Sequence, residues 1–314
     1  MKPRVVVTGG AGFIGSHLVD SLSKDHEVVV LDNFTSGEMR NLKHARAQHV
    51  RIVKGDICDR ALTRRLFRKT KAVFHQAAVV SIAKTTQHPE LTNRVNVDGT
   101  LSVLLAAKEN KVSKVIIASS SSVYGNNGAL VKQEDMPLKP ISIYAASKLA
   151  TENYAVAFHK AFGLGTVLLR YFNVYGPRQA DGIYSGVIPI FVRRALKGKP
   201  ITIYGDGMQE RDFTFVTDIV DANRAALDIE EASGGAYNVG TGQSITVKEL
   251  SKRVMDACDR PKLRVLKKPA RTYDVRVSRA DIGKARRDLN YVPRVTLSQG
   301  LERMAEWFRG KSQI

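Results

Sequence analysis

The segment Thr8-Gly-Gly-Ala-Gly-Phe-Ile-Gly15 decides the fold, because it follows the apolar run Val5-Val6-Val7 and opens an amphipathic stretch. Glycines lack a Cβ, so the backbone can turn sharply here and approach a bound phosphate closely. The N–H groups of the first helical turn then point at the anion. A glycine-rich turn between a strand and a helix therefore predicts a dinucleotide site. The expected contacts are Gly9, Gly12, Phe13, Ile14 and Gly15.

Around this turn, the first 170 residues alternate short apolar runs with amphipathic stretches. Such alternation is typical of parallel strands joined by right-handed helical crossovers. We therefore predict an α/β protein with a Rossmann-type, doubly wound parallel sheet. The expected strands are 4–7, 28–31, 50–53, 72–74, 115–118 and 166–169, and the expected helices are 14–23, 61–69, 95–109 and 144–162.

After Gly176-Pro177 the loops become longer and richer in Gly, Arg and Asp. We predict an NAD-binding domain over 1–176 and a smaller C-terminal α/β lobe over 177–314 that binds the substrate. The boundary is soft, since the two parts are expected to exchange segments. Helices are expected at 187–196, 218–227, 247–257 and 297–308, with a strand at 201–204.

The net charge of +19 comes from 49 Lys and Arg against 30 Asp and Glu, and it favours anionic partners. The basic residues are dispersed, however, and form no arm or tail. The sequence also lacks an RNA-binding aromatic pattern and zinc-finger spacing. We therefore expect no nucleic-acid partner, and the excess of basic residues is left without an explanation.

Several other classes are excluded by simple features. No apolar run approaches the roughly 20 residues that span a bilayer, so no membrane partner is expected. The N-terminus shows no secretory leader, which predicts a cytoplasmic protein. The two cysteines, Cys58 and Cys258, belong to no CxxC or Cys/His cluster. We therefore expect neither a disulfide framework nor a metal site.

Two carboxylates follow the second and third expected strands. Asp32 can accept hydrogen bonds from the adenosine ribose and would repel a 2′-phosphate, which selects NAD over NADP. A turn-capping carboxylate is the alternative for Asp32. Asp56, in Gly55-Asp56-Ile57, could meet the adenine amino group.

The strand 115–118 ends in a run of serines, Ser119 to Ser122, and ligands bind at this end of strands in α/β sheets. Farther on, Tyr144 and Lys148 have the i, i+4 spacing that puts both side chains on one helix face. A nearby ammonium and a positive nicotinamide would lower the pKa of the tyrosine. The phenolate could then take a hydroxyl proton while hydride leaves the same carbon for NAD.

Together these segments resemble the extended short-chain dehydrogenase/reductase family, and within it the UDP-galactose (UDP-glucose) 4-epimerase-like enzymes. The resemblance covers essentially the whole chain. It is carried by residues 8–17, 31–33, 55–57, 75–78, 96–100, 119–125, 144–148, 169–177, 211–213, 238–240 and 280–281.

The resemblance implies that Ser120 hydrogen-bonds the reacting 4-hydroxyl, that Tyr144 is the base, and that Lys148 holds the nicotinamide ribose. It implies a resident NAD cofactor and a UDP-sugar substrate. Further cofactor contacts implied are Asn33, Ser36, Gly37, Asp56, Ile57, Ala77, Ala78, Val80, Asn96, Ala118 and Tyr171. Implied substrate contacts are Ser122, Asn173, Val187, Thr202, Tyr204, Arg211, Arg271, Asp274 and Ser278.

The two arginines in that set, Arg211 and Arg271, resemble those that clamp the diphosphate, a task suited to a planar cationic fork. The match at Arg271 departs from the family pattern, because Thr272-Tyr273 stands where Pro-Gly is usual before Asp274. The resemblance also implies a homodimer formed through the helices near 95–109 and 147–162.

The residues after Ser120 favour one reaction within the family. Related dehydratases carry an Asp-Glu pair there and decarboxylating relatives carry a Glu, whereas this chain has Ser121 and Ser122. Elimination of water lacks its acid and base, so C4 epimerisation through a 4-keto sugar is predicted. A dehydratase, a reductase or a uronate epimerase is the alternative. A non-catalytic NAD-binding or nucleic-acid-binding protein would not need Ser120, Tyr144 and Lys148.

The position of Ser278 bears on substrate size. A bulky Tyr at the matching family position restricts the pocket to UDP-glucose and UDP-galactose, and a small residue admits N-acetylhexosamines. We therefore expect both kinds of sugar to be accepted. The preferred sugar, and whether TDP can replace UDP, stay open.

Overall fold

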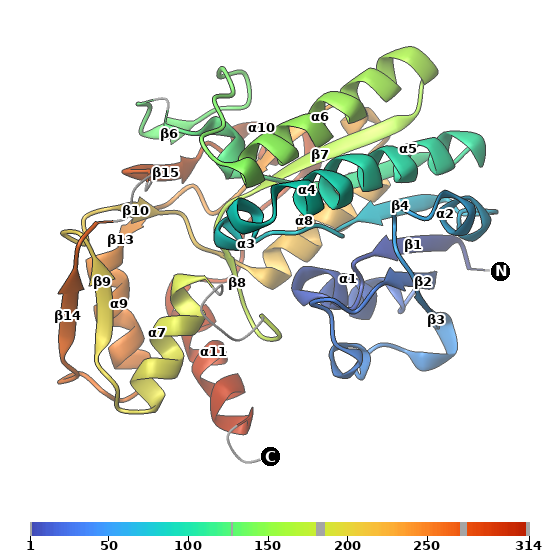
Figure 1. Cartoon of the computed structure of the whole chain (residues 1–314). Coiled ribbons are helices and arrows are strands. Elements are labelled where there is room, and N and C mark those ends of the chain that lie inside the picture. Colours follow the sequence, from blue (N-terminus) through green and yellow to red (C-terminus); the bar gives the residue numbers. More distant parts are fainter. Residues whose placement is uncertain (1, 127, 180–185, 271–274, 312–314) are drawn as a thin grey trace.

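The computed structural model describes residues 2–126, 128–179, 186–270 and 275–311 (Figure 1). Its centre is a seven-stranded parallel sheet in the order β12-β7-β5-β4-β1-β2-β3. The strands are β1 (Arg4–Thr8), β2 (Glu27–Asp32), β3 (Val50–Lys54), β4 (Ala72–His75), β5 (Lys114–Ser120), β7 (Gly165–Tyr171) and β12 (Ala236–Val239). All six predicted strands are confirmed, and the predicted doubly wound sheet with them.

Helices cover both faces of this sheet, as alternate side chains of β1 show. Val5 and Val7 are buried in one core with α1 (Phe13–Leu22), α8 (Val216–Asp228) and α10 (Gly283–Leu289). Val6 is buried in another core with α2 (Arg60–Leu66), α5 (Gly99–Glu109) and α6 (Ile143–Phe162). Burial on both faces explains why the central strands β1 and β4 are mostly apolar.

Three elements of the large sheet and its cover come from after residue 176. Strand β12 pairs with β7, helix α8 packs beside α1, and helix α10 packs against β12. Strand β12 was missed, because four residues of mixed polarity between glycines give no clear strand pattern. The division of the chain into 1–176 and 177–314 stays a prediction.

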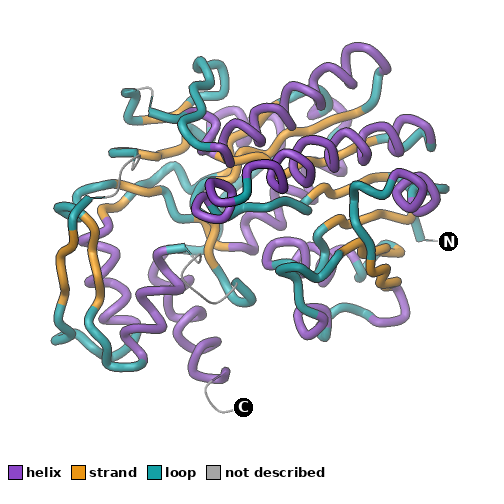
Figure 2. Tube along the Cα trace, viewed as in Figure 1, coloured by secondary structure: helices purple, strands orange, loops and turns teal. Residues whose placement is uncertain are grey.

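A smaller core is formed by α7 (Val187–Leu196), α9 (Val247–Ala257) and α11 (Leu297–Lys311) around the strand β9 (Ile201–Tyr204). Strand β14 (Val265–Lys268) pairs with β9 in parallel. Figure 2 shows this group of helices and strands set apart from the large sheet. The helices and the strand predicted here are confirmed, except that α8 packs on the large sheet instead.

Short strands connect the two cores. One small sheet has the order β13-β10-β15-β6, and a second pairs β11 with β8. The strands are β6 (Val131–Lys132), β8 (Val174–Tyr175), β10 (Glu210–Arg211), β11 (Thr214–Phe215), β13 (Ile245–Thr246) and β15 (Val277–Ala280). These pairings place residues that are far apart in the sequence beside the carboxyl end of the large sheet (Figure 1).

The helix predicted over 95–109 is divided in the structure. Residues Arg94–Asp98 form a π-helical turn, η3, and α5 follows from Gly99. Short helices α3 (Ile82–Gln87) and α4 (Pro89–Asn93) precede it, and short 3-10 helices are η1 (Met39–Leu42), η2 (Ala47–His49), η4 (Ser121–Tyr124) and η5 (Glu230–Ala232). Single π-helical turns inside helices often occur at functional sites.

In the described part of the chain, no helix is long and apolar enough to cross a membrane. The same residues contain no group of His, Cys, Asp and Glu side chains arranged to hold a metal ion.

Candidate active site

The glycine turn after β1 is closed by its own backbone. The N–H of Gly9 donates to Leu31 O at 2.8 Å, and that of Gly12 donates to Gly9 O at 3.1 Å. Gly9 has a φ of +68°, and a Cβ on Gly15 would lie 2.1 Å from Gly9 O. No side chain caps α1 at Gly12. The turn therefore offers a helix N-terminus and a cradle that side chains would fill, which fits the pyrophosphate of NAD.

Asp32 lies directly beside this turn. Its Oδ2 accepts the N–H of Ala11 at 2.9 Å, and its Oδ1 accepts the N–H of Phe34 at 2.8 Å. Gly37 is packed against the same carboxylate, since a Cβ there would lie 2.8 Å from Oδ2. The carboxylate is thus fixed at the rim of the glycine turn, where an adenosine ribose would lie. Asn33, by contrast, is exposed, and its Oδ1 accepts the Thr35 N–H at 3.1 Å.

Asn96 lies in the π-helical turn and joins the loop after β4 to α6. Its Oδ1 accepts the Val79 N–H at 2.8 Å, and its Nδ2 donates to Val79 O at 3.0 Å and to Ser147 Oγ at 2.9 Å. Asn96 thereby orients the loop that carries the predicted contacts Ala77, Ala78 and Val80. Val80 is exposed there, with an accessible fraction of 63%.

His75 begins the 75–78 segment that carries the resemblance, but the sequence assigned it no role in the site. It is buried between Thr8 Oγ1, 2.8 Å from Nδ1, and Thr100 Oγ1, 3.0 Å from Nε2. The Thr100 hydroxyl donates to Asn96 O at 2.6 Å, so it accepts the Nε2–H of His75, and Thr8 donates to Nδ1. Burial lowers the pKa of His75 to about 3, with a further contribution from Lys148, so the ring is neutral. A neutral ring with one fixed tautomer holds the ends of β1 and β4 together.

The predicted trio of Ser120, Tyr144 and Lys148 meets where the end of β5 contacts α6. Ser120 Oγ accepts from Ser122 N at 3.2 Å and from Ser122 Oγ at 3.0 Å. Burial raises the pKa of Tyr144, and a hydrogen bond with Ser120 acts in the opposite direction. In the chain alone burial outweighs that hydrogen bond, and the lowering predicted for Tyr144 beside a positive nicotinamide stays a prediction.

Lys148 is buried one turn after Tyr144 on α6. Its Nζ donates to Ala118 O at 2.8 Å. Burial lowers the pKa of Lys148 to about 8, while the nearby Glu152 carboxylate acts to raise it. The ammonium is therefore directed at the strand end that carries Ser120.

Asp212 connects the predicted substrate residues that the small sheet brings together. Asn173 Nδ2 donates to Asp212 O at 3.0 Å. Arg211 on β10 is the register partner of Ser278 on β15, and the N–H of Asp212 donates to Ser278 O at 2.9 Å. The buried Asp212 carboxylate accepts the N–H groups of Thr241, Gly242 and Ala280 at 2.8, 2.9 and 3.2 Å. Sequence reasoning missed this residue, although it lies next to Arg211.

The other predicted contacts are placed as follows. Tyr171 ends β7, and its hydroxyl meets Asn223 Oδ1 at 3.1 Å. Asp56 Oδ1 accepts the Cys58 N–H at 2.9 Å, so this carboxylate stabilises the turn that follows β3. Val187, Thr202 and Tyr204 lie on α7 and β9, which belong to the smaller lobe, rather than on β10 or β15. Ile57 is buried, Ser36 is exposed, and Arg271 and Asp274 lie outside the described residues.

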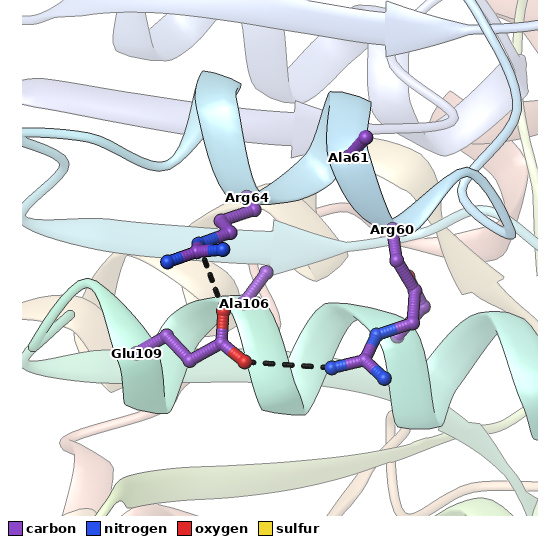
Figure 3. A pocket seen from close by; sticks show the side chains of 6 residues that line it. Arg60, Ala61, Arg64, Ala106 and Glu109 are labelled. Atoms are coloured by element: carbon purple, nitrogen blue, oxygen red, sulfur yellow. Dashed lines mark hydrogen bonds and ion pairs between the residues drawn. The ribbon is translucent and has the colours of Figure 1, made fainter.

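A cavity of about 300 Å³ lies elsewhere, between α2 and α5 (Figure 3). Arg60 Nη2 and Arg64 Nε both face the Glu109 carboxylate, at 3.4 and 3.3 Å. None of the predicted site residues lines this cavity, and its arginines already share a counter-ion. It is therefore separate from the candidate active site.

Comparison with known proteins identifies the class. The profile of the NAD dependent epimerase/dehydratase family matches residues 5–240. The chain is 41% identical to the UDP-glucose 4-epimerase of Mycolicibacterium smegmatis over 318 residues, which are 99% of this chain and 100% of that protein. The chain belongs to the NAD-dependent epimerase/dehydratase family.

Solved structures agree closely with this fold. The UDP-N-acetylglucosamine 4-epimerase of Methanobrevibacter ruminantium in complex with UDP-N-acetylmuramic acid has a TM-score of 0.94 and 38% identity, covering 99% of this chain and 100% of that one. The Thermus thermophilus UDP-glucose 4-epimerase in complex with NAD has a TM-score of 0.89 and 37% identity, covering 98% and 99%. Relatives named as decarboxylases and dehydratases also match, at 34% identity. The protein is thus a UDP-glucose 4-epimerase-like enzyme that uses NAD, as predicted.

Replacing Gly15 by Ala tests the cradle. The new Cβ would lie 2.1 Å from Gly9 O, so the turn must open. We expect NAD retention after gel filtration, measured by absorbance of the denatured supernatant, to fall by about tenfold or more. Gly310→Ala is the matched control, because a Cβ at Gly310 meets nothing within 4 Å. Full NAD occupancy in Gly15→Ala would contradict this placement of the pyrophosphate.

Proposed function

We propose that the enzyme interconverts the C4 epimers of a UDP-hexose, using an NAD that stays bound between turnovers. The observation that carries the proposal is the meeting of Ser120 and Tyr144 beside Lys148 at the β5–α6 contact. The residues after Ser120 are Ser121 and Ser122, so the turn supplies no carboxyl group to expel a hydroxyl. Such a site supports oxidation and re-reduction at one carbon rather than elimination.

The roles of the chain's own residues follow from this geometry. Ser120 holds the C4 hydroxyl against Tyr144, whose phenolate takes the proton as the 4-keto sugar forms. Lys148 keeps a positive charge beside the phenolate and binds the nicotinamide ribose. Tyr144 later returns the proton to the C4 oxygen of the inverted sugar. NAD, when bound, supplies the hydride acceptor and donor.

Inversion requires the sugar to present its other face while the nucleotide stays in place. We propose that Arg211 holds the diphosphate, with Asn173 and Ser278 lining the sugar side of the same small sheet. Asp212 supports this assignment, because its backbone and carboxylate contacts fix all three segments relative to one another. The sugar can then rotate about its bond to a fixed diphosphate.

Tyr144→Phe removes the proposed base while leaving the ring in place. We expect its rate of UDP-galactose conversion to be lower by about 10² to 10⁴-fold, the contribution of one general base. Tyr154→Phe on the same helix, where Tyr154 is exposed, is the matched control and should keep its rate. Near-normal turnover by Tyr144→Phe would dismiss Tyr144 as the base. Release of free NADH or a stable keto product would instead indicate a dehydratase or reductase.

Ser278→Tyr tests the sugar that the site accepts. We propose that the small Ser278 side chain admits UDP-GlcNAc and UDP-GalNAc as well as UDP-glucose and UDP-galactose. A tyrosine there should remove most turnover of UDP-GlcNAc and leave turnover of UDP-glucose, measured as product ratios by chromatography. Ser278→Ala, which stays small, should convert both. Equal or better turnover of UDP-GlcNAc by Ser278→Tyr would refute the assignment.

We also propose a homodimer formed through α5 and α6. In support, α6 exposes the aromatic side chains of Tyr154 and Phe162, with accessible fractions of 39% and 53%. Sedimentation should give twice the chain mass of 34.6 kDa, and Tyr154→Glu should move the equilibrium toward the monomer. A single-chain mass for the unaltered protein at micromolar concentration would contradict the dimer.

A further inference from the structure

Three consecutive residues at the end of β5 contact α6 at sites one turn apart. Ala118 O accepts from Lys148 Nζ at 2.8 Å, Ser119 Oγ donates to Glu152 Oε1 at 2.5 Å, and Ser120 hydrogen-bonds Tyr144. The middle contact does not touch the reacting groups. The Ser119–Glu152 hydrogen bond does, however, fix the position of α6 along β5, because Ser119 lies between Ala118 and Ser120.

Glu152 is held from a second strand as well. Arg170 Nε donates to Oε1 at 3.0 Å and Nη2 donates to Oε2 at 2.7 Å, which is a two-pronged ion pair. Arg170 on β7 is the register partner of Ser119 on β5. The Glu152 carboxylate on α6 therefore binds Ser119 and Arg170, which are register partners on two adjacent strands. All three side chains are buried, with accessible fractions of 3%, 3% and 4% for Ser119, Glu152 and Arg170.

Arg170 also reaches the far end of the serine turn. Its Nη1 donates to Tyr124 Oη at 2.9 Å, and the Tyr124 hydroxyl donates to Asn238 Oδ1 at 2.6 Å. Tyr124 ends the 3-10 turn that begins immediately after Ser120. The Glu152–Arg170 ion pair therefore holds the turn at both ends. Glu152 binds Ser119, which precedes Ser120, and Arg170 binds Tyr124, which ends the turn.

We propose that Glu152 and Arg170 are a positioning pair, which sets Ser120 opposite Tyr144 and keeps the buried Lys148 ammonium in place. The proposal rests on the proposed function of Tyr144 and Lys148. Neither Glu152 nor Arg170 is assigned contact with the substrate or with NAD. Their effect on the reaction is exerted through the residues they hold.

The charge of Glu152 has its own consequence for Lys148. The groups that face Lys148 are Glu152 on its own helix, the neutral His75 on β4 and the carbonyl of Ala118 on β5. Burial lowers the Lys148 pKa to about 8, and Glu152 is the charge that acts to raise it. Without that charge, the Lys148 ammonium loses its proton at a lower pH. Activity that requires the Lys148 ammonium is then lost at a lower pH as well.

Glu152→Gln tests this by removing the charge while keeping the shape and an acceptor for Ser119. The measurement is kcat and KM for interconversion of UDP-glucose and UDP-galactose across neutral and alkaline pH. We expect the basic limb of the kcat profile to move down by about one pH unit, hence about tenfold lower kcat on that limb, with KM nearly unchanged. Glu249→Gln, which breaks the exposed pair with Arg253 on α9, is the matched control and should leave the profile unmoved.

A kcat profile of Glu152→Gln that coincides with that of the unaltered protein would overturn the proposal. So would an equal loss at every pH, because removal of the Glu152 charge must move the basic limb if that charge supports the Lys148 ammonium. An unaltered protein that fails to interconvert the two sugars contradicts the proposed function alone. In that case the same pH series is measured with whichever UDP-sugar reduces the bound NAD.

Glu152→Gln leaves the Arg170 charge buried and unpaired, which is strongly destabilising. Ser119→Ala is therefore the second variant, since it frees Glu152 from β5 and keeps the ion pair intact. We expect a kcat lower by about threefold or more, KM unchanged, and a basic limb where the unaltered protein has it. An unchanged kcat in Ser119→Ala would overturn the positioning role.

Discussion

The packing of helix α6 against the ends of β5 and β7 is the contact on which the site depends. It is made largely by buried polar groups, among them the Glu152–Arg170 ion pair and the Lys148 ammonium. Buried charges are costly unless they are paired or hydrogen-bonded. Glu152 and Arg170 form an ion pair, and Lys148 donates a hydrogen bond to Ala118 O. A helix displaced by even one residue would leave these groups unsatisfied. The polar contacts therefore specify a single register, which apolar packing alone would not fix.

The same burial sets the electrostatic condition of the site. It raises the pKa of Tyr144, lowers that of Lys148, and keeps His75 neutral. In each case the low-dielectric surroundings oppose the charged form. The chain alone thus favours a neutral tyrosine, and a bound positive ring would reverse that preference. Base strength at Tyr144 would then depend on the cofactor, which agrees with an NAD that does not leave between turnovers.

The sequence alone predicted the parallel sheet and the residues of the glycine turn, because these depend on local patterns. Alternating apolar runs marked the strands, and Gly15 is required by a backbone contact six residues away. The Tyr144–Lys148 spacing likewise places both side chains on one helix face. These are short-range properties, which neighbouring residues determine.

Residues that act through distant partners could not be predicted in this way. His75 and Glu152 are each held by groups from two other segments, and Asp212 by groups from three. Only the folded sheet brings those groups together. The burial that raises the Tyr144 pKa in the chain alone could not be predicted for the same reason. The ammonium one turn away could be read from the spacing, but the extent of burial could not.

A continuous set of contacts joins the two sides of the site. From Glu152 it passes through Arg170 and Tyr124 to Asn238 on β12. Two residues later Gly240 is packed so tightly on Asp212 that a Cβ there would lie 2.8 Å from Oδ2. Asp212 in turn fixes the segments of Asn173 and Ser278. Strand β12, which the sequence pattern did not predict, therefore connects α6 to the residues proposed to hold the sugar. Because β12 comes from the C-terminal half and pairs with β7, the residues proposed to hold the sugar and helix α6 are joined through one strand of the large sheet.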